Sequence, residues 1–185
     1  ALTTRELARM IDRANLYFPH LPDGEFDSPL GLSTGASTIF GVTGGVTEAV
    51  LRRLIGSSKV EDLEQISISG VRGDDSIKEV NVTLGDREVK IAVVNGLRSA
   101  EEVIQKIQSG EASYDFVEVM ACKRGCIAGG GQPLPIGPRT KKARFEGMYA
   151  IDDIAQIKLS TQNPIITELY NGFLKGKEHK LLHTR

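Results

Sequence analysis

The chain has 185 residues, of which 40% are apolar and 25% charged, with a formal net charge of -1 and no tryptophan. Such a length can bury a real core in one domain, and the composition excludes a disordered chain. The weak net charge argues against nucleic-acid binding, and no apolar run reaches the roughly 18 residues of a membrane span. The N-terminal stretch ALTTRELARMIDRANLYF lacks a signal-peptide pattern, so we expect a cytoplasmic protein.

Two helices are expected in the first third of the chain, separated by a loop. Thr3 and Glu6 have the spacing of a capping box ahead of an apolar stripe, which predicts a helix over residues 4–13. Residues 20–38 are rich in Pro, Gly, Ser and Asp, and a loop of this length favours a functional or partner-binding role. The second helix is expected over residues 44–54, with an inner face made of Val46, Val50, Leu51 and Leu54.

The middle of the chain combines strands with a helix. The alternating stretches SIKEVNVTL and REVKIAVVN, joined by a turn at residues 85–86, predict a β-hairpin. A helix is then expected over residues 99–110, with Ile104 and Ile107 facing inward. The apolar run 114–121 predicts a buried strand, which leads directly into the segment that holds both cysteines.

The last part of the chain is expected to be helical. Helical patches follow Pro138, and a final helix is expected over residues 163–174 with Pro164 at its first position. Two acidic pairs are interpreted as solvated surface rather than as paired catalytic carboxylates: Asp74-Asp75 and Asp152-Asp153.

Both cysteines of the chain lie in the segment EVMACKRGCIAGGGQP, residues 118–133. A disulfide between Cys122 and Cys126 would close a tight ring, and the chain lacks secretory features. Zinc would need further ligands and a catalytic thiolate would need a base, but the three histidines lie far away in sequence. An iron-sulfur site fits better, because thiolates bind iron and glycines let backbone N–H groups approach cluster sulfurs. A cubane cluster ordinarily needs four cysteines, so two buried structural cysteines remain an alternative.

Two other groups carry weaker signals. Gly41, Gly44 and Gly45 precede a helix but lack the lysine of a P-loop and the Rossmann spacing, so nucleotide binding is not expected there. His179 and His183 would share a helix face and could bind a metal, although such pairs usually just pack.

The stretch FVEVMACKRGCIAGGGQP resembles the last of three signature motifs of the iron-only (FeFe) hydrogenases, E-x-M-A-C-x-x-G-C-x-x-G-G-G-Q-P, with every fixed position present. Other stretches resemble the same family in the family's order: LTTRELARMI, FDSPLG, GASTIFGVTGGVTEAVLR, IAVVNG and HKLLHT. The resemblance implies that residues 1–185 form the C-terminal lobe of the hydrogenase large-subunit catalytic domain, without the first lobe and its two cysteine motifs. It also implies an α/β fold in which helices flank a mixed or parallel sheet that includes a small β-hairpin region.

The resemblance assigns roles by position. Cys122 would be a terminal ligand of a 4Fe-4S cubane, and Cys126 would ligate the cubane and bridge it to a two-iron unit. That unit carries CO, cyanide and a dithiolate, and the whole is the H-cluster. Met120, Phe40 and Val46 would line the two-iron unit as catalytic-site residues. Because the other two cluster cysteines would lie upstream, we expect the H-cluster to be absent from this chain alone.

The implied reaction is the reversible interconversion of protons and electrons with H2, by heterolytic splitting between the distal iron and the bridgehead amine of the dithiolate. Expected partners are the missing N-terminal lobe and ferredoxin or another iron-sulfur electron carrier. We expect the isolated chain to be inactive and to self-associate through its exposed lobe interface. The alternatives are a hydrogenase-like iron-sulfur assembly protein, a sensory hydrogenase and a stand-alone interaction module.

Some positions depart from the family pattern. Lys123 and Arg124 stand where small residues are frequent, and they would raise the reduction potential of the cluster if they pointed inward. Ser37 stands where a glycine is frequent and Thr47 where a methionine is frequent, which suggests an unusual or sensory branch.

Overall fold

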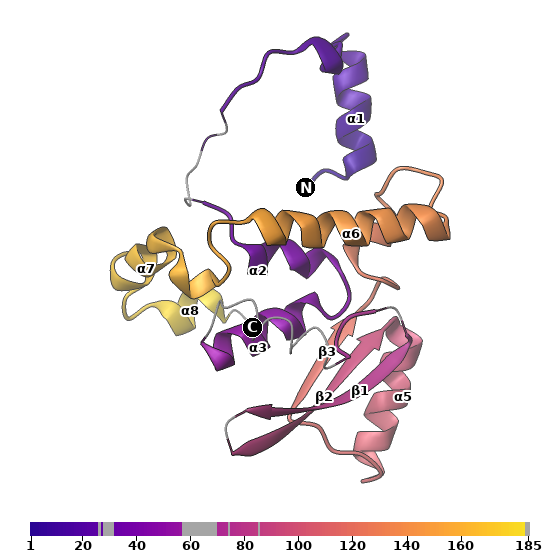
Figure 1. Cartoon of the computed structure of the whole chain (residues 1–185), viewed down its shortest axis with the longest axis vertical. Helices are drawn as coiled ribbons and strands as arrows, with labels where there is room; N and C mark the ends of the chain where they lie inside the picture. The colour runs from indigo at the N-terminus through magenta and orange to yellow at the C-terminus, as the bar shows by residue number, and fades with distance from the viewer. Residues whose placement is uncertain (26, 28–31, 57–69, 74, 85, 184–185) are drawn as a thin grey trace.

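The computed structural model describes most of the chain: residues 1–25, 27, 32–56, 70–73, 75–84 and 86–183. Its described part has an α/β architecture built on one three-stranded sheet (Figure 1). β1 (Ile77–Leu84) and β2 (Arg87–Asn95) form an antiparallel hairpin, and β3 (Phe116–Met120) pairs in parallel with β2. The expected hairpin and mixed sheet are therefore confirmed, although residue 85 of the expected turn lies outside the described residues.

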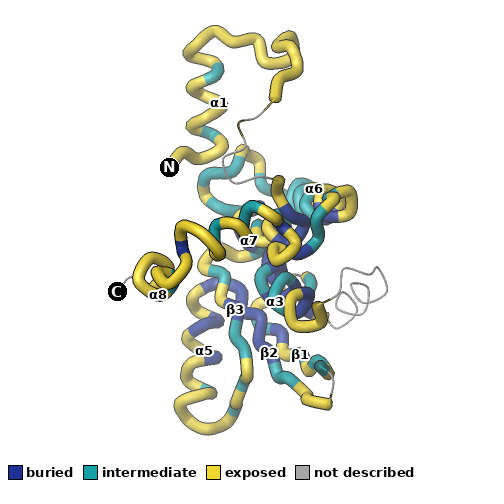
Figure 2. Tube along the Cα trace, turned by 90° about the vertical axis from the view of Figure 1, so that its left-hand side faces the viewer, coloured by how far each residue is buried: buried dark blue, intermediate teal, exposed yellow. Residues whose placement is uncertain are grey.

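Helices cover both faces of the sheet. α5 (Leu97–Gln108) connects β2 to β3 on one face, and α3 (Gly45–Ile55) packs on the other (Figure 2). Because alternate side chains of a strand point to opposite faces, β2 contributes to two apolar cores. The core under α3 contains Leu51, Val71, Ile91 and Val93. The core under α5 contains Ala92, Val94, Ala100 and Val103.

The inner face of α5 differs from the sequence expectation. Ile104 and Ile107 are 52% and 43% exposed, whereas Ala100 and Val103 are buried against the sheet. The helix begins two residues earlier than expected, immediately after Gly96, whose φ of 89° ends β2 in a sharp turn. This short connection fixes the rotation of α5 and brings its small side chains against the sheet, which leaves both isoleucines outside.

The inner face of α3 also differs from the expectation. Leu51 is buried, but Leu54 is 60% exposed and both Val46 and Val50 are only half-buried. Apart from Gly45, the other buried positions of this helix are polar: Thr47, Glu48 and Arg52. Hydropathy could not predict this face, because its packing partners are ionic groups on other elements.

A second group of helices lies at the end of the sheet where the cysteines are (Figure 1). α2 (Gly35–Thr38), with a capping box from Thr34, lies inside the expected loop over residues 20–38, of which residues 26 and 28–31 are outside the described part. α6 (Pro138–Ile154) is the longest of the described helices. The apolar core of this region contains Tyr149 of α6 together with Ile39, Val42 and Ile127 from the segments that follow α2 and the cysteine turn.

The C-terminal residues form two short helices instead of one. α7 (Pro164–Asn171) begins with Pro164 as expected, after Asn163, whose side chain accepts a hydrogen bond from the N–H of Ile165. α7 therefore confirms the expected helix and its start, but it ends at Asn171 instead of residue 174. It is not the final helix, because α8 (Glu178–Leu182) follows.

α1 (Thr4–Arg13) matches the expected range, and both hydrogen bonds of its capping box are present. It has no buried residue, and it stands away from the sheet (Figures 1 and 2). The N–H of Arg5 donates to the carbonyl oxygen of Gly131 (3.2 Å), which joins α1 to the glycine run after the cysteines. Among the described residues, no helix combines the length and apolar character needed to cross a membrane.

Candidate functional site

Both cysteines lie on a turn that begins where β3 ends, which we call the cysteine turn (residues 121–126). The N–H of Gly125 donates to the carbonyl oxygen of Cys122 (3.0 Å), and a short 3-10 helix begins at Cys126. Arg124 and Gly125 have φ values of 71° and 78°, a left-handed backbone that is uncommon for a residue with a Cβ. Both cysteines are free thiols exposed to solvent, so the alternative of two buried structural cysteines is wrong.

A buried asparagine at the end of β2 holds the cysteine turn in place. Asn95 is 2% exposed, and its Oδ1 accepts hydrogen bonds from the N–H of Arg124 (2.7 Å) and the hydroxyl of Thr43 (2.9 Å). The first bond fixes the left-handed residue of the turn, and the second ties the segment ahead of α3 to the same atom. Sequence reasoning missed Asn95, although an amide that ends an apolar strand just before a glycine is a usable signal.

A glycine in the turn allows the segment ahead of α3 to pack directly against it. A Cβ added at Gly125 would lie 2.7 Å from the carbonyl oxygen of Gly41 and 3.0 Å from the Cα of Val42. Any other residue would therefore push the two backbones apart, and its side chain would disfavour the left-handed backbone as well. This contact sets the cysteine turn beside the segment that contains Phe40.

The carboxylate of Glu118, in the middle of β3, caps α3 from the neighbouring strand. It accepts hydrogen bonds from the N–H of Gly44 (2.8 Å), the N–H of Thr47 (2.7 Å) and the hydroxyl of Thr47 (2.6 Å). Gly44, the N-cap residue of α3, has no side chain that could satisfy these donors. The negative charge also lies at the positive end of the helix dipole. Glu118 therefore joins the strand that leads to the cysteines with the helix that carries Val46.

Glu118 also corrects the expectation of a buried apolar strand over residues 114–121. It is 5% exposed, whereas its neighbour Val119 is 47% exposed. The available signal was a single carboxylate inside an apolar run, together with a helix start that lacks a polar cap of its own. Thr47, at a position where the family often has methionine, supplies the hydroxyl that binds this carboxylate.

The structure places the five predicted site residues on two segments that meet. Cys122 and Cys126 are exposed on the cysteine turn, and Met120 is the half-buried last residue of β3. Phe40 is 46% exposed, and Val46 is half-buried in the first turn of α3. The segments meet through the contact of Gly125 with Gly41 and through the Glu118 cap. The role of each residue toward a cluster stays a prediction.

The donor set fits half of an iron-sulfur site. Two thiols on one turn, next to glycines 129–131, can bind iron and admit a cluster without steric obstruction. A cubane needs four such ligands. In the described part of the chain, no group of three or more His, Cys, Asp or Glu side chains lies close enough to hold a metal ion. The remaining ligands would therefore have to come from outside these residues.

An ionic network that we call the buried ion cluster (Glu48, Arg52, Arg72, Tyr149 and Asp152) fixes α3 to α6 behind this site. The Arg52 guanidinium binds both oxygens of Asp152 (2.8 and 2.6 Å) and one oxygen of Glu48 (2.6 Å). Glu48 also accepts hydrogen bonds from Arg72 (2.8 and 2.7 Å) and from the Tyr149 hydroxyl (2.9 Å). The Arg72 guanidinium lies 3.9 Å from the centre of the Tyr149 ring. Asp152 is 3% exposed, so its interpretation as solvated surface is wrong, whereas Asp74 lies outside the described residues.

The protonation states in the buried ion cluster follow from its geometry. Burial by itself lowers the pKa of Arg52, but hydrogen bonds with Asp152 and the charge of Glu48 outweigh it and raise that pKa. Burial, followed by the charge of Glu48, raises the pKa of Tyr149. Arg52 therefore stays charged and Tyr149 stays a neutral donor across the physiological range.

The chain matches two known family models. The one described as "Iron only hydrogenase large subunit, C-terminal domain" matches residues 1–130, which include the sheet and the cysteine turn. The chain belongs to the iron-only hydrogenase family. A model described as "Iron hydrogenase small subunit" matches residues 138–185, which form α6, α7 and α8.

Individual iron-only hydrogenases agree with this placement. The chain is 45% identical over 188 residues to the NADP-reducing hydrogenase subunit HndD of Solidesulfovibrio fructosivorans, covering 99% of the chain and 32% of that protein. It is 48% identical over 136 residues to the periplasmic Fe hydrogenase large subunit of Nitratidesulfovibrio vulgaris, covering 74% of the chain and 32% of that protein. A solved structure of the FeFe hydrogenase HydA1 of Chlamydomonas reinhardtii superposes with a TM-score of 0.72 at 35% identity, covering 97% of the chain and 53% of that structure.

A more distant relative is named for iron-sulfur assembly. The cytosolic iron-sulfur assembly component 3 of Pongo abelii is 27% identical over 194 residues, covering 100% of the chain and 40% of that protein.

The chain spans about a third of the length of its hydrogenase relatives, 32% in both cases. The activity of a whole iron-only hydrogenase is therefore a proposal for it.

Proposed function

We propose that residues 1–185 are the C-terminal lobe of a hydrogenase catalytic domain. They would supply two cysteine ligands of its H-cluster and one wall of the pocket that surrounds the cluster. The carrying observation is that two exposed thiols share one turn, which a glycine contact clamps against the segment of Phe40. The identity of 45% to a hydrogenase subunit over 99% of the chain supports the same reading.

Within this proposal each residue has a limited task. Bound in the complete protein, the H-cluster supplies the electron and proton chemistry that interconverts protons and H2. Cys122 and Cys126 would hold it, and the half-buried Met120 and Val46, together with Phe40, would exclude water from its surroundings. Asn95 and Glu118 would act as positioning residues, because they fix the cysteine turn and the start of α3 relative to β3.

The test uses the intact protein that contains this chain, produced without oxygen and reconstituted with the cluster. Three variants are compared: Cys122→Ala, Cys126→Ala and the control Val119→Ala, which changes an exposed side chain on β3, the strand that leads into the cysteine turn. We expect both cysteine variants to lose H2 production and the infrared bands of CO and cyanide, while the control keeps both. Survival of those bands and of H2 production in Cys126→Ala would contradict the proposal. Robust H2 production by the isolated 185 residues would contradict the prediction that they hold only half of the site.

Iron-sulfur assembly is the second candidate function, because a relative named cytosolic iron-sulfur assembly component 3 aligns with 100% of the chain. Proteins that hold only an iron-sulfur cluster would show its visible absorbance without the infrared bands of CO and cyanide. The reconstituted intact protein therefore discriminates between the two functions in one measurement.

Partners and location belong to the same proposal. Reduced ferredoxin is the proposed electron donor, and H2 evolution driven by it, compared with dithionite alone, is the direct test. The rest of the same protein is the proposed neighbour of the exposed lobe face, and sedimentation of the isolated chain would reveal the expected self-association. A cytoplasmic location is also proposed and needs cell fractionation, since one relative is named as periplasmic.

A further inference from the structure

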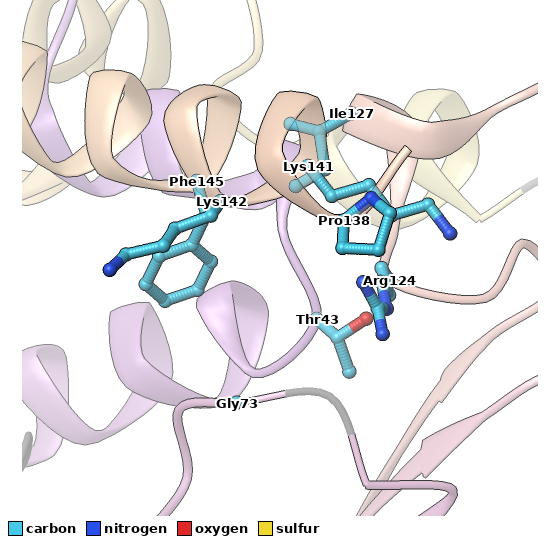
Figure 3. A pocket seen from close by; sticks show the side chains of 8 residues that line it. All are labelled: Thr43, Gly73, Arg124, Ile127, Pro138, Lys141, Lys142 and Phe145. Atoms are coloured by element: carbon cyan, nitrogen blue, oxygen red, sulfur yellow. The ribbon is translucent and has the colours of Figure 1, made fainter. Parts of the chain in front are cut away.

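A pocket of about 360 Å³ lies between the first turns of α6 and the cysteine turn (Figure 3). Its walls include the apolar side chains of Ile127, Pro138 and Phe145, and its rim includes Arg124, Lys141 and Lys142. In Figure 3 the Phe145 ring projects from α6 into the space above Gly73. Pockets of this size with apolar walls and a few polar groups are typical of small-ligand sites in proteins. Neither cysteine lines this pocket, nor do the other predicted site residues.

Positively charged side chains gather at the N-terminal end of α6, where the helix dipole is itself positive. Arg139, Lys141 and Lys142 lie in the first two turns, and the first turn has no acidic residue. Cations are unfavourable near the positive end of a helix, so their accumulation there suggests that they serve an anion. Of the described residues that line the pocket, none is acidic.

Two lysines are the available ligands for such an anion. Lys142 lies 3.7 Å from Glu146, but both side chains are largely exposed, and a pair of this kind is weak enough to exchange for a ligand. Arg124 already takes part in another interaction, and the hydroxyl hydrogen of Thr43 is donated to Asn95, so these groups form walls. In Figure 3 the Lys141 and Lys142 side chains extend toward opposite sides of the pocket, so both flexible stems would have to turn inward to hold one phosphate between them.

We propose that this pocket binds a small organic phosphate of about the size of a nucleoside monophosphate. Its planar apolar body would pack against Phe145 and Pro138, and its phosphate would be held by Lys141 and Lys142. The apolar walls favour this ligand over inorganic phosphate, which would leave them uncovered. The site is independent of the proposed hydrogenase activity, because no step of that reaction enters the argument.

The test is calorimetric titration of the intact protein with AMP and UMP at low salt, with adenosine and inorganic phosphate as the two halves of the ligand. The variant Lys141→Gln/Lys142→Gln is compared with Lys175→Gln/Lys180→Gln, which removes the same charge from exposed positions near α8. We expect saturable binding of at least one nucleotide, at least tenfold weaker in the first variant and unchanged in the second. Adenosine and inorganic phosphate should each bind more weakly than AMP. Circular dichroism verifies that both variants fold.

Two outcomes would overturn the proposal. One is the absence of saturable binding of either nucleotide, or equal binding by both double variants. The other is binding of a polyglutamate peptide that depends on Lys141 and Lys142 while the nucleotides do not bind. That result would assign these lysines to an acidic protein partner instead.

Discussion

The sheet face under α5 and the cysteine end of the sheet are held together by different kinds of contact. Under α5 the buried side chains are small and apolar, with Ala92 and Val94 facing Ala100 and Val103. At the cysteine end the buried side chains include many ionic and polar groups: Asn95, Glu118 and the buried ion cluster, of which only Arg72 is partly exposed. Apolar packing tolerates small shifts, whereas hydrogen bonds and bidentate ion pairs lose much of their energy when their geometry changes. The polar end therefore specifies position more strongly, and this is where the cysteine turn lies.

Removal of one partner from the buried ion cluster should have the largest effect on stability. Asp152→Ala leaves the buried Arg52 guanidinium without its bidentate partner. Removing one partner of a buried ion pair lowers the free energy of unfolding by about 3–5 kcal/mol. The matched control is Asp153→Ala, because that side chain is exposed. Urea unfolding of both variants checks the prediction, and similar unfolding midpoints would mean that the cluster contributes little to the cysteine end.

A cavity in the core under α5 should lower the stability by less. Val103→Ala removes two buried carbons from the core under α5 and leaves a cavity. Together these changes should lower the free energy of unfolding by about 2 kcal/mol. Ile104→Ala is the control, because that side chain is 52% exposed and should lose much less. Urea unfolding midpoints measure both, and a reversed order would restore the original expectation that Ile104 faces inward.

The sequence predicted individual helices and strands better than it predicted which of their faces are buried. Alternation predicted β1 and β2, and a capping box predicted α1, because these signals are local. The rotation of α5 was missed since a one-residue connection from β2 decides it, and this is a property of the tertiary fold.

The candidate site shows the same division. Cys122 and Cys126 were found because a motif of fixed spacing names them. Asn95 and Glu118 were not, because their partners lie 29 and 71 residues away in the chain and no local pattern pairs them. Arg52 and Asp152 are 100 residues apart, so charge patterning assigned the aspartate to the surface.

Loosening the cysteine turn should have a moderate effect on stability and a specific effect on the thiols. Asn95→Ala leaves the N–H of Arg124 and the hydroxyl of Thr43 without their acceptor, at a cost of about 1–2 kcal/mol. Asn81→Ala, at an exposed position of β1, is the control. In the cluster-free chain the reaction rates of the two thiols with a disulfide reagent should change in the first variant only. Unchanged rates together with the expected loss of stability would show that Asn95 supports the sheet without positioning the turn.

The smallest effect should come from an exposed contact just before β3, at the end of the sheet away from the cysteines, and it should depend on pH. The N–H of Lys90 (2.9 Å) and then the guanidinium of Arg87 (2.6 Å) bind the carboxylate of Asp115 and lower its pKa. A carboxylate whose pKa is lower in the folded state stabilises the fold above its unfolded pKa, and this contribution is lost as the pH falls through the folded pKa. Asp115→Asn should therefore lower the urea midpoint slightly at neutral pH and leave it unchanged in strong acid. A difference for Asp115→Asn that persists in strong acid would assign its effect to packing instead of charge. This end of the sheet would then depend on the Asp115 side chain as the cysteine end depends on Asn95.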